Sequence, residues 1–253
     1  MQKYGFLGIN EYFCKLRLVC DTMSCILHIE SATEGCSVAV SEEGELLFFK
    51  EDHTEHNNAV TLGVFVDEAL SLIDSRGLEM TAVAVSEGPG SYTGLRIGVS
   101  MAKGICYSRN ARLIAVPTLS LLCVPLLLGD EIPEDALLCP MIDARRMEVY
   151  STIYDRALNE VRGTRADIVD ADSYREYLDR GPVCFFGNGA AKCRECIQHP
   201  NAIFVDGIRP LAKWMFPLAE KALLQEKFED VAYFEPFYLK DFIALKPKNL
   251  LKN

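Results

Sequence analysis

Hydrophobic positions near the start of the chain form short runs of the length expected for strands. Apolar runs at 24–29, 38–40 and 46–49 are joined by links that contain Gly35 and Gly44. Glycine supplies the positive φ that tight hairpin links require. Three sequential strands joined this tightly predict an antiparallel meander.

The pattern changes to a helical period between residues 57 and 75. One stripe of this helix is formed by Ala59, Leu62, Val66, Ala69 and Ile73, while Val60, Val64 and Leu72 lie off it. A helix with one buried side needs only one apolar stripe, so the extra positions indicate a second apolar contact. A strand at 81–85, a helix at 93–107 and a strand at 112–116 follow. This order predicts parallel pairing through a helical crossover.

The chain after Pro117 alternates helices and strands again. We expect helices at 119–128, near 173–179, from 188 and at 210–226, and strands at 137–142, 148–154 and 183–186. No convincing sequence repeat relates the two halves. The alternation favours two linked α/β units.

Composition places the 253-residue chain among globular proteins, with 49% hydrophobic and 25% charged residues. Its 26 basic and 36 acidic residues give a net charge of −10, which argues against a free-standing nucleic-acid binder. The ten cysteines are too sparse for a disulfide scaffold. Residues 1–22 lack the apolar stretch of a signal peptide, and no run is long enough to cross a membrane. We therefore expect free thiols in a reducing cytoplasm.

A glycine-rich segment joins the strand at 81–85 to the following helix. It reads Ser86-Glu87-Gly88-Pro89-Gly90-Ser91-Tyr92-Thr93-Gly94-Leu95-Arg96-Ile97-Gly98. Backbone N–H groups at such a position can cradle an anion, but the local pattern alone favours a tight turn with unusual dihedrals at Gly88 and Gly90. Ser91 or Thr93 is the expected N-cap. The segment is neither a Walker A loop nor a dinucleotide fingerprint.

Small residues recur every four positions along the helix that follows this segment. Gly94, Gly98 and Ala102 leave one face nearly bare, and Gly98 and Gly104 each cost about 1 kcal/mol relative to alanine inside a helix. The bare face serves either the chain's own core or a close-packed partner helix.

Several ordered segments together resemble the bacterial TsaB family. They are Ile26–Thr33, Cys36–Ala39, the Gly88–Gly98 loop, Pro117–Leu119, Ile142–Arg145 with Glu148–Tyr150, and Glu235–Leu239. The resemblance implies an α/β fold of the actin-like, Hsp70-like, sugar-kinase-like (ribonuclease H-like) kind, with two lobes that each hold a mixed sheet flanked by helices. It begins at Met23, so residues 1–22 are expected to be an extension with a mis-assigned start. Residues 23–116 would form the N-terminal lobe with the dimerisation surface, and 117–253 the C-terminal lobe and tail.

The resemblance also implies a function. Family members are non-catalytic subunits required for N6-threonylcarbamoyladenosine formation next to the tRNA anticodon. They bind a TsaD-like catalytic paralogue, which works with a TsaE-like ATPase, and contact tRNA only indirectly. The implied chain is cytoplasmic and has no cofactor of its own, with nucleotide expected only at the seam with the catalytic partner.

Residues for the partner surface follow from the two helices that the family uses for dimerisation. The interface set is Val60, Val64, Gly94, Gly98, Met101 and Ala102, and the signature loop is Gly88, Pro89, Gly90, Ser91, Thr93, Gly94 and Arg96. Without the partner, the same helices are expected to form a homodimer. We expect Gly98→Leu to abolish that dimer if the helices meet closely.

The alternative is an enzyme in its own right, an ATP-using actin-like kinase or a metallopeptidase. The catalytic paralogue carries a His-x-x-x-His metal pair after its glycine loop, and residues 94–110 contain no histidine. ATP-using relatives have an aspartate followed by glycine in the first turn, where this chain has Glu30-Ser31-Ala32-Thr33. We therefore assign no catalytic and no metal-binding residue.

Three other clusters receive structural interpretations. Cys193 and Cys196 form a CxxC without a second ligand pair, so incidental thiols are favoured over a metal or redox site. The charged turn at 143–148 is interpreted as solvated or salt-bridged. The lysines of the tail from Lys240 to Lys252 are taken as a solvated end, with contact to tRNA phosphates as the alternative.

Overall fold

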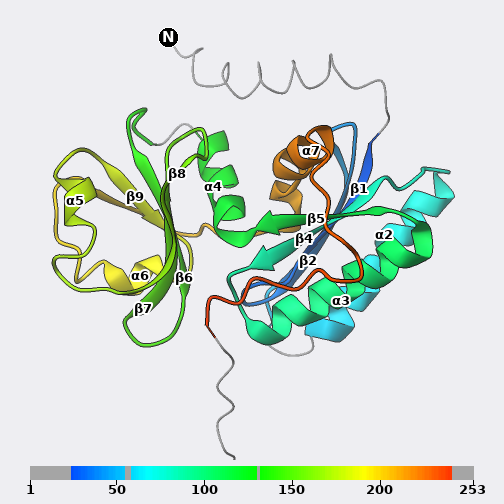
Figure 1. Ribbon diagram of the computed structural model, residues 1–253, viewed down its shortest axis with the longest axis horizontal. Helices are drawn as coiled ribbons and strands as arrows, with labels where there is room; N and C mark the ends of the chain where they lie inside the picture. Colours follow the sequence, from blue (N-terminus) through cyan, green and yellow to red (C-terminus); the bar gives the residue numbers. More distant parts are fainter. Residues whose placement is uncertain (1–23, 55–57, 130–131, 241–253) are drawn as a thin grey trace, which may run out of the picture.

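The protein consists of two α/β lobes placed side by side (Figure 1). The computed structural model describes residues 24–54, 58–129 and 132–240. The proposed extension at 1–22 and the end of the tail lie outside the described residues. No helix of the described part is long and apolar enough to cross a membrane.

The first sheet has the strand order β3-β2-β1-β4-β5. Its strands are β1 (Cys25–Glu30), β2 (Cys36–Glu42), β3 (Glu45–Asp52), β4 (Ala82–Gly88) and β5 (Arg112–Pro117). The first three pair antiparallel, whereas β4 pairs parallel with β1 and β5 parallel with β4. Gly35 and Gly44 have φ of 92° and 76°. The predicted meander, its glycine links and the parallel crossover are confirmed.

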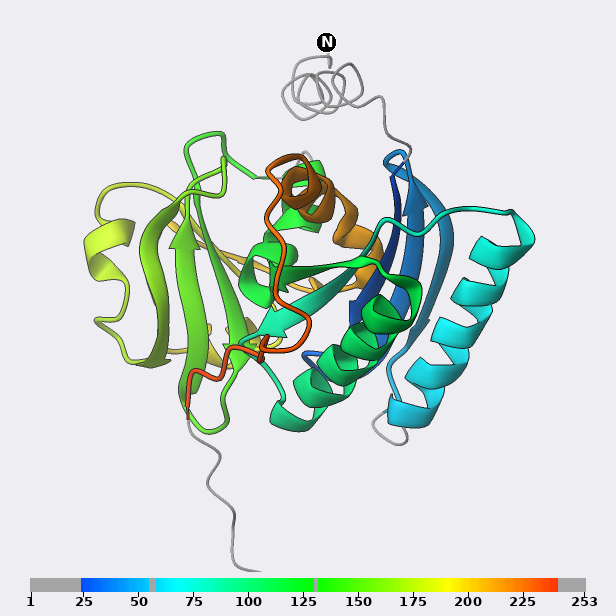
Figure 2. The same cartoon turned by 45° about the vertical axis from the view of Figure 1, so that its right-hand side comes forward.

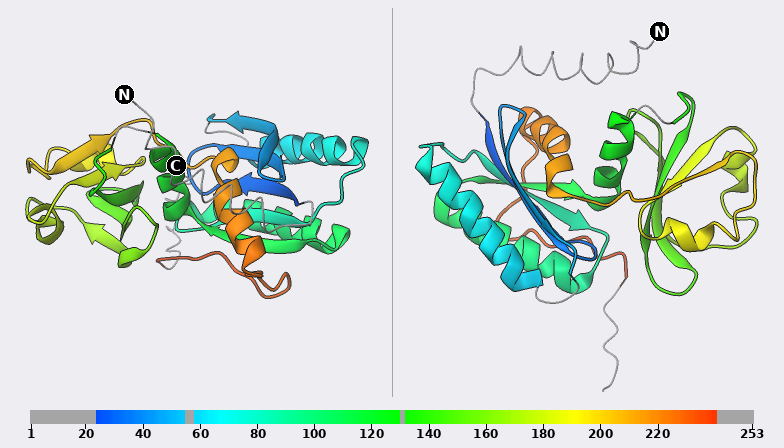
Figure 3. Two further views of the ribbon diagram at one scale, coloured as in Figure 1. Left: turned by 90° about the horizontal axis from the view of Figure 1, so that it is seen from above. Right: turned by 180° about the vertical axis from the view of Figure 1, so that it is seen from behind.

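Helices α2 (Asn58–Ser75) and α3 (Tyr92–Arg109) lie side by side on one face of this sheet (Figures 2 and 3). The predicted α2 stripe is buried at Leu62, Val66, Ala69 and Ile73, while Ala59 at its start is exposed. These side chains pack with the β1, β2 and β4 residues that point to the same face, including Leu27, Val38 and Val83. The alternation of strand residues thus directs one side of the sheet to the two helices.

The second sheet has the order β10-β9-β6-β7-β8. Its strands are β6 (Leu137–Asp143), β7 (Glu148–Tyr154), β8 (Glu160–Ile168), β9 (Val183–Phe186) and β10 (Ala202–Val205), with the short helices α5 (Arg175–Leu178) and α6 (Ala190–Cys193). The sequence pattern missed β8, since its residues are mostly polar with Gly163 inside, and β10, which has only four residues.

The two sheets have the same topology. In each, three sequential strands form an antiparallel meander, and two further strands join parallel beside the first strand of the meander. This duplicated unit confirms the actin-like, ribonuclease H-like fold expected from the sequence. The repeat is one of topology, which explains why no sequence repeat is apparent.

Helix α4 (Thr118–Leu128) lies between the lobes and packs on both. Its Leu119 and Leu122 belong to a core with Leu138 of β6, whereas Leu121 belongs to a core with Ile26 and Ile114 of the first sheet. Shared burial of α4 therefore joins the lobes through apolar contact.

The helix expected at 210–226 is divided into η1 (Ala212–Trp214) and α7 (Phe216–Leu224). Both pack on the face of the first sheet opposite α2 and α3, where Met215 and Ala219 meet Ile26 and Ala84. The chain after residue 210 thus returns to the first lobe, although the sequence division placed 117–253 in the second. Apolar residues on both faces of β1 require this second cover.

Candidate functional site

The glycine-rich loop connects β4 to α3 and lies against the segment after β1. Gly88 has a φ of 117° and precedes Pro89 in a cis peptide bond. Ser91 is the N-cap of α3, because its side chain accepts a hydrogen bond from the Gly94 N–H at 3.3 Å. Of the two candidate caps, the structure therefore selects Ser91, and Thr93 is exposed.

The segment after β1 occupies the space at the N-terminus of α3. The Ser91 N–H donates to the Ala32 carbonyl oxygen at 2.7 Å, and the Ser31 hydroxyl donates to the Gly94 carbonyl oxygen at 2.9 Å. A Cβ added at Gly90 would overlap the Ala32 carbonyl oxygen. The backbone cradle that the sequence offered to an anion is thus occupied by the segment after β1.

Ser31 packs against the face of α3 that is formed by Gly94 and Gly98. A Cβ at Gly94 would overlap the Ser31 carbonyl oxygen, and one at Gly98 would overlap the Ser31 hydroxyl. Gly94, Gly98 and Ala102 are all buried. The structure therefore assigns these three residues to the chain's own packing, and their placement on the partner surface is corrected for this reason.

Glu30, at the end of β1, occupies the position where ATP-using relatives were expected to have aspartate. Its carboxylate accepts hydrogen bonds from the Ala32 N–H at 2.6 Å and from the Ser86 hydroxyl. Burial raises the pKa of Glu30 from 4.5 to about 8, although the bond from Ala32 acts in the opposite direction. The side chain is therefore mostly protonated at neutral pH.

The space beside Glu30 is small. Glu34, His53 and Arg209 help to line a cavity of about 10 Å³. This volume is roughly that of one water-sized probe, far below the several hundred Å³ of a typical ligand pocket. His53 faces Glu51 at 3.2 Å, and His56 lies outside the described residues.

The remaining interface residues lie on the outer surfaces of α2 and α3. Val60 and Val64 are 67% and 50% exposed, and Met101 is partly buried against the core. A Cβ added at Gly63 or Gly104 would meet open space, with no neighbouring side chain or strand within 4 Å. These five residues, called the α2–α3 surface below, carry no polar side chain. The sequence analysis noted the cost of Gly104 in a helix interior without placing it on this surface, and it missed Gly63, which carries the same signal of an uncompensated helix glycine.

Comparison with known proteins identifies the family to which this chain belongs. The model of the TsaD family, tRNA N6-adenosine threonylcarbamoyltransferase, matches residues 52–247. The tRNA threonylcarbamoyladenosine biosynthesis protein TsaB of Escherichia coli is 28% identical over 232 residues, which cover 87% of this chain and 96% of that protein. The chain belongs to the TsaB family, within the wider group that the TsaD model describes.

Other relatives agree with this assignment. TsaB of Bacillus subtilis is 28% identical over 68% of this chain and 75% of its own length. A solved structure of YeaZ from Pseudomonas aeruginosa superposes with a TM-score of 0.72 and 24% identity, over 86% of this chain and all of the other. That likeness supports the fold of this TsaB-family chain.

The charged turn between β6 and β7 of this TsaB-family chain is internally bonded. The Asp143 carboxylate accepts from the Arg145 N–H at 2.7 Å and pairs with Lys192, whose ammonium also donates to the Glu148 carbonyl oxygen at 2.7 Å. Arg145 and Arg146 have φ of 70° and 53°. The bonds of Asp143 and Lys192 thus hold the tight turn between β6 and β7, in agreement with the salt-bridged interpretation.

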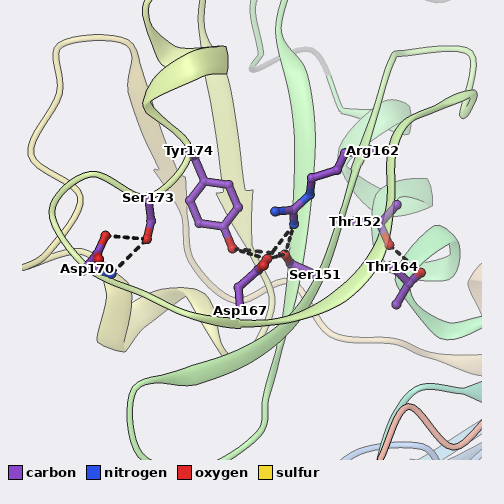
Figure 4. A network of polar contacts seen from close by, with 8 residues as sticks. All are labelled: Ser151, Thr152, Arg162, Thr164, Asp167, Asp170, Ser173 and Tyr174. Atoms are coloured by element: carbon purple, nitrogen blue, oxygen red, sulfur yellow. Dashed lines mark hydrogen bonds and ion pairs between the residues drawn. The ribbon is translucent and has the colours of Figure 1, made fainter.

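A second polar cluster of the same lobe brings together side chains of the types found in active sites (Figure 4). One oxygen of Asp167 accepts from the Ser151 hydroxyl at 2.6 Å, the Tyr174 hydroxyl at 2.9 Å and the Arg162 guanidinium at 2.6 Å. Ser151 is fully buried, and the Arg162 and Asp167 side chains are 10% and 19% exposed. These groups bond to one another, although the buried Arg162 Nε has no hydrogen-bond partner among the described residues. The cluster thus ties β8 to β7 and to Tyr174 at the start of α5.

Potential metal ligands are dispersed. Among the described residues no three His, Cys, Asp or Glu side chains gather closely enough to hold an ion. Cys193 is buried and Cys196 is half-buried, and both are free thiols. Burial raises the pKa of the Cys193 thiol to about 11, which disfavours the thiolate form.

Proposed function

We propose that the chain is a non-catalytic subunit required for N6-threonylcarbamoyladenosine formation next to the tRNA anticodon. It would act by binding and supporting a TsaD-like catalytic paralogue, together with a TsaE-like ATPase. The names of its relatives support the pathway. The exposed Val60 and Val64 on a helix whose other face is fully packed carry the proposal of a partner surface.

The site around the glycine loop supports a subunit without chemistry of its own. The cradle at the start of α3 holds Ser31 and Ala32, and Glu30 is enclosed beside a cavity of about 10 Å³. We therefore assign no cofactor to the chain alone and place any nucleotide at the seam with the catalytic partner.

Contact with tRNA would be indirect. The net charge of −10 disfavours a free-standing RNA-binding chain, and a partner would supply the basic surface. We place the complex in the cytoplasm, where tRNA modification and free thiols are both expected; eight cysteines among the described residues are unpaired.

In the absence of the partner we expect the α2–α3 surface to form a twofold homodimer. The variant Gly98→Leu is no longer a clean test, because a bulky residue there collides with Ser31 inside the chain. Val64→Asp is the better variant, since Val64 is half exposed and is not among the side chains that pack in the core of the first lobe. Sedimentation analysis should find that this substitution shifts a dimer to monomer.

Reconstitution tests the proposed function. The purified chain, a TsaD-like protein and a TsaE-like ATPase are assayed singly and mixed, with threonylcarbamoyl-adenylate and unmodified tRNA. We expect transfer only when this chain and the TsaD-like protein are both present. Transfer, ATP turnover or peptide cleavage by the chain alone would contradict the proposal and favour a kinase or metallopeptidase.

A further inference from the structure

The segment 229–240, called the strap below, runs from the first lobe to the second. It leaves the edge of β5, passes α3 and the glycine loop, and ends beside the β6–β7 turn (Figures 1 and 2, orange to red). Three stretches that the sequence analysis singled out therefore meet: the loop at 88–98, the turn at 143–148 and the Glu235–Leu239 motif. The proposed function gives none of these contacts a role.

Backbone contacts fix the strap to the first lobe. The Glu229 N–H donates to the Leu113 carbonyl oxygen at 2.8 Å, and the Phe237 N–H donates to the Glu87 carbonyl oxygen at 2.7 Å. Lys103 of α3 donates to the carbonyl oxygens of Ala232 and Phe234, each at 3.0 Å. These bonds are spread from residue 229 to residue 237, so this part of the strap belongs structurally to the first lobe.

Side chains of the strap are exposed or only partly buried, and of these Val231 and Phe234 pack against the core of the first lobe. A groove of about 310 Å³ lies between part of the strap and α3, lined by Arg96, Ser100 and Lys103 on one side and Glu235 on the other. Tyr238 meets the ring of Tyr92 with centroids 4.9 Å apart. These side-chain contacts add to the backbone bonds in holding the strap on the first lobe.

The strap reaches the second lobe through Lys240, whose ammonium pairs with the Glu148 carboxylate. Glu148 is held in place by its own backbone, which bonds to Ala144 and Arg145 across the turn. The Lys240 and Glu148 side chains are 49% and 20% exposed. Exposed pairs of this kind are weak and are screened by salt.

We infer that the strap is an inter-lobe clasp, anchored on the first lobe by backbone hydrogen bonds and fastened to the second by the Lys240–Glu148 ion pair. High salt unfastens it. The lobes stay joined through α4, so unfastening changes only how firmly the β6–β7 turn is held to the strap. This device does not depend on the proposed function, because it needs no partner.

Hydrogen exchange on the full chain tests the clasp. Lys240→Ala and Glu148→Gln should each speed exchange about two- to five-fold at the strap amides 237–239 and at the turn amides 144–148, the range expected for losing an exposed pair. Wild-type protein in 1 M salt should show the same acceleration. The charge-reversed double variant Lys240→Glu with Glu148→Lys should restore slow exchange.

Lys50→Ala is the matched control. It breaks the Lys50–Glu68 pair, whose side chains are 43% and 40% exposed but lie within the first lobe. It should leave the strap and turn amides unchanged. Equal exchange in Lys240→Ala and Lys50→Ala, or acceleration that the reversed pair does not repair, would overturn the clasp.

Discussion

Gly94 and Gly104 show how one residue type has two roles on a single helix. Gly94 faces the Ser31 carbonyl oxygen, whereas Gly104 faces open space. Alanine at 94 must displace backbone and should destabilise the fold by about 2 kcal/mol or more. Alanine at 104 should stabilise it by up to about 1 kcal/mol, because glycine is a poor helix former. Urea unfolding of both variants measures the difference, and equal shifts would contradict the packing of Ser31 into α3.

Glu30 predicts a dependence of stability on pH. Its pKa in the folded chain is about 8, against 4.5 ordinarily, so folding favours the protonated form. Its contribution is fully present below pH 4.5 and is lost as pH rises to about 8. The Glu30→Gln variant should lack this loss. Its free energy of unfolding relative to wild type should therefore rise by roughly 2–5 kcal/mol as the pH increases from about 4.5 to 8.5. Thermal unfolding across that range checks it, and parallel pH profiles for the two proteins would refute a buried, protonated Glu30.

Sequence patterns predicted residue roles less well than they predicted elements. The spacing of Gly94, Gly98 and Ala102 reveals a bare helix face but cannot say what fills it, because Ser31 lies more than sixty residues earlier in the chain. Val60 and Val64 were identified correctly as surplus apolar positions, since their distance from the main stripe alone indicates exposure.

At the scale of elements, strands and helices with strong periodicity were predictable and β8 was not. Its outer residues are exposed, while Arg162 and Asp167 point inward to a polar cluster, so no apolar alternation marks it. The single helix expected at 210–226 also differs from the structure, where Met215 separates η1 from α7. Packing of this region against the first sheet determines where its helices begin and end.

The polar cluster makes a prediction about β8. Asp167→Ala leaves Ser151, Tyr174 and Arg162 without their common acceptor in a mostly buried place, so we expect a loss of about 3–5 kcal/mol. Hydrogen exchange of β8 amides should accelerate with it. Asp170→Ala, which removes the exposed carboxylate that accepts from the Ser173 hydroxyl and the Asp172 N–H, is the control and should leave β8 exchange unchanged. Unaltered stability in Asp167→Ala would show that the cluster does not hold the strand.

The whole molecule duplicates one topology with unequal helices. The crossover helices of the first lobe, α2 and α3, have 18 residues each, whereas their counterparts α5 and α6 have four. Only the first lobe, among the described residues, therefore presents a broad paired-helix surface. Such asymmetry is expected if the first lobe binds a partner and the second completes the fold.

The affinity of the chain for a TsaD-like protein tests this account most directly. Titration calorimetry compares wild type with the double variant Val60→Asp, Val64→Asp, and with a control, Val161→Asp with Ile168→Asp, on exposed apolar residues of β8. We predict micromolar or tighter binding for wild type and control, and binding at least about 100-fold weaker for the α2 variant, since buried charge at an apolar interface is costly. Equal affinity of the α2 variant and wild type, with folding verified by circular dichroism, would contradict the assignment of the α2–α3 surface to the partner.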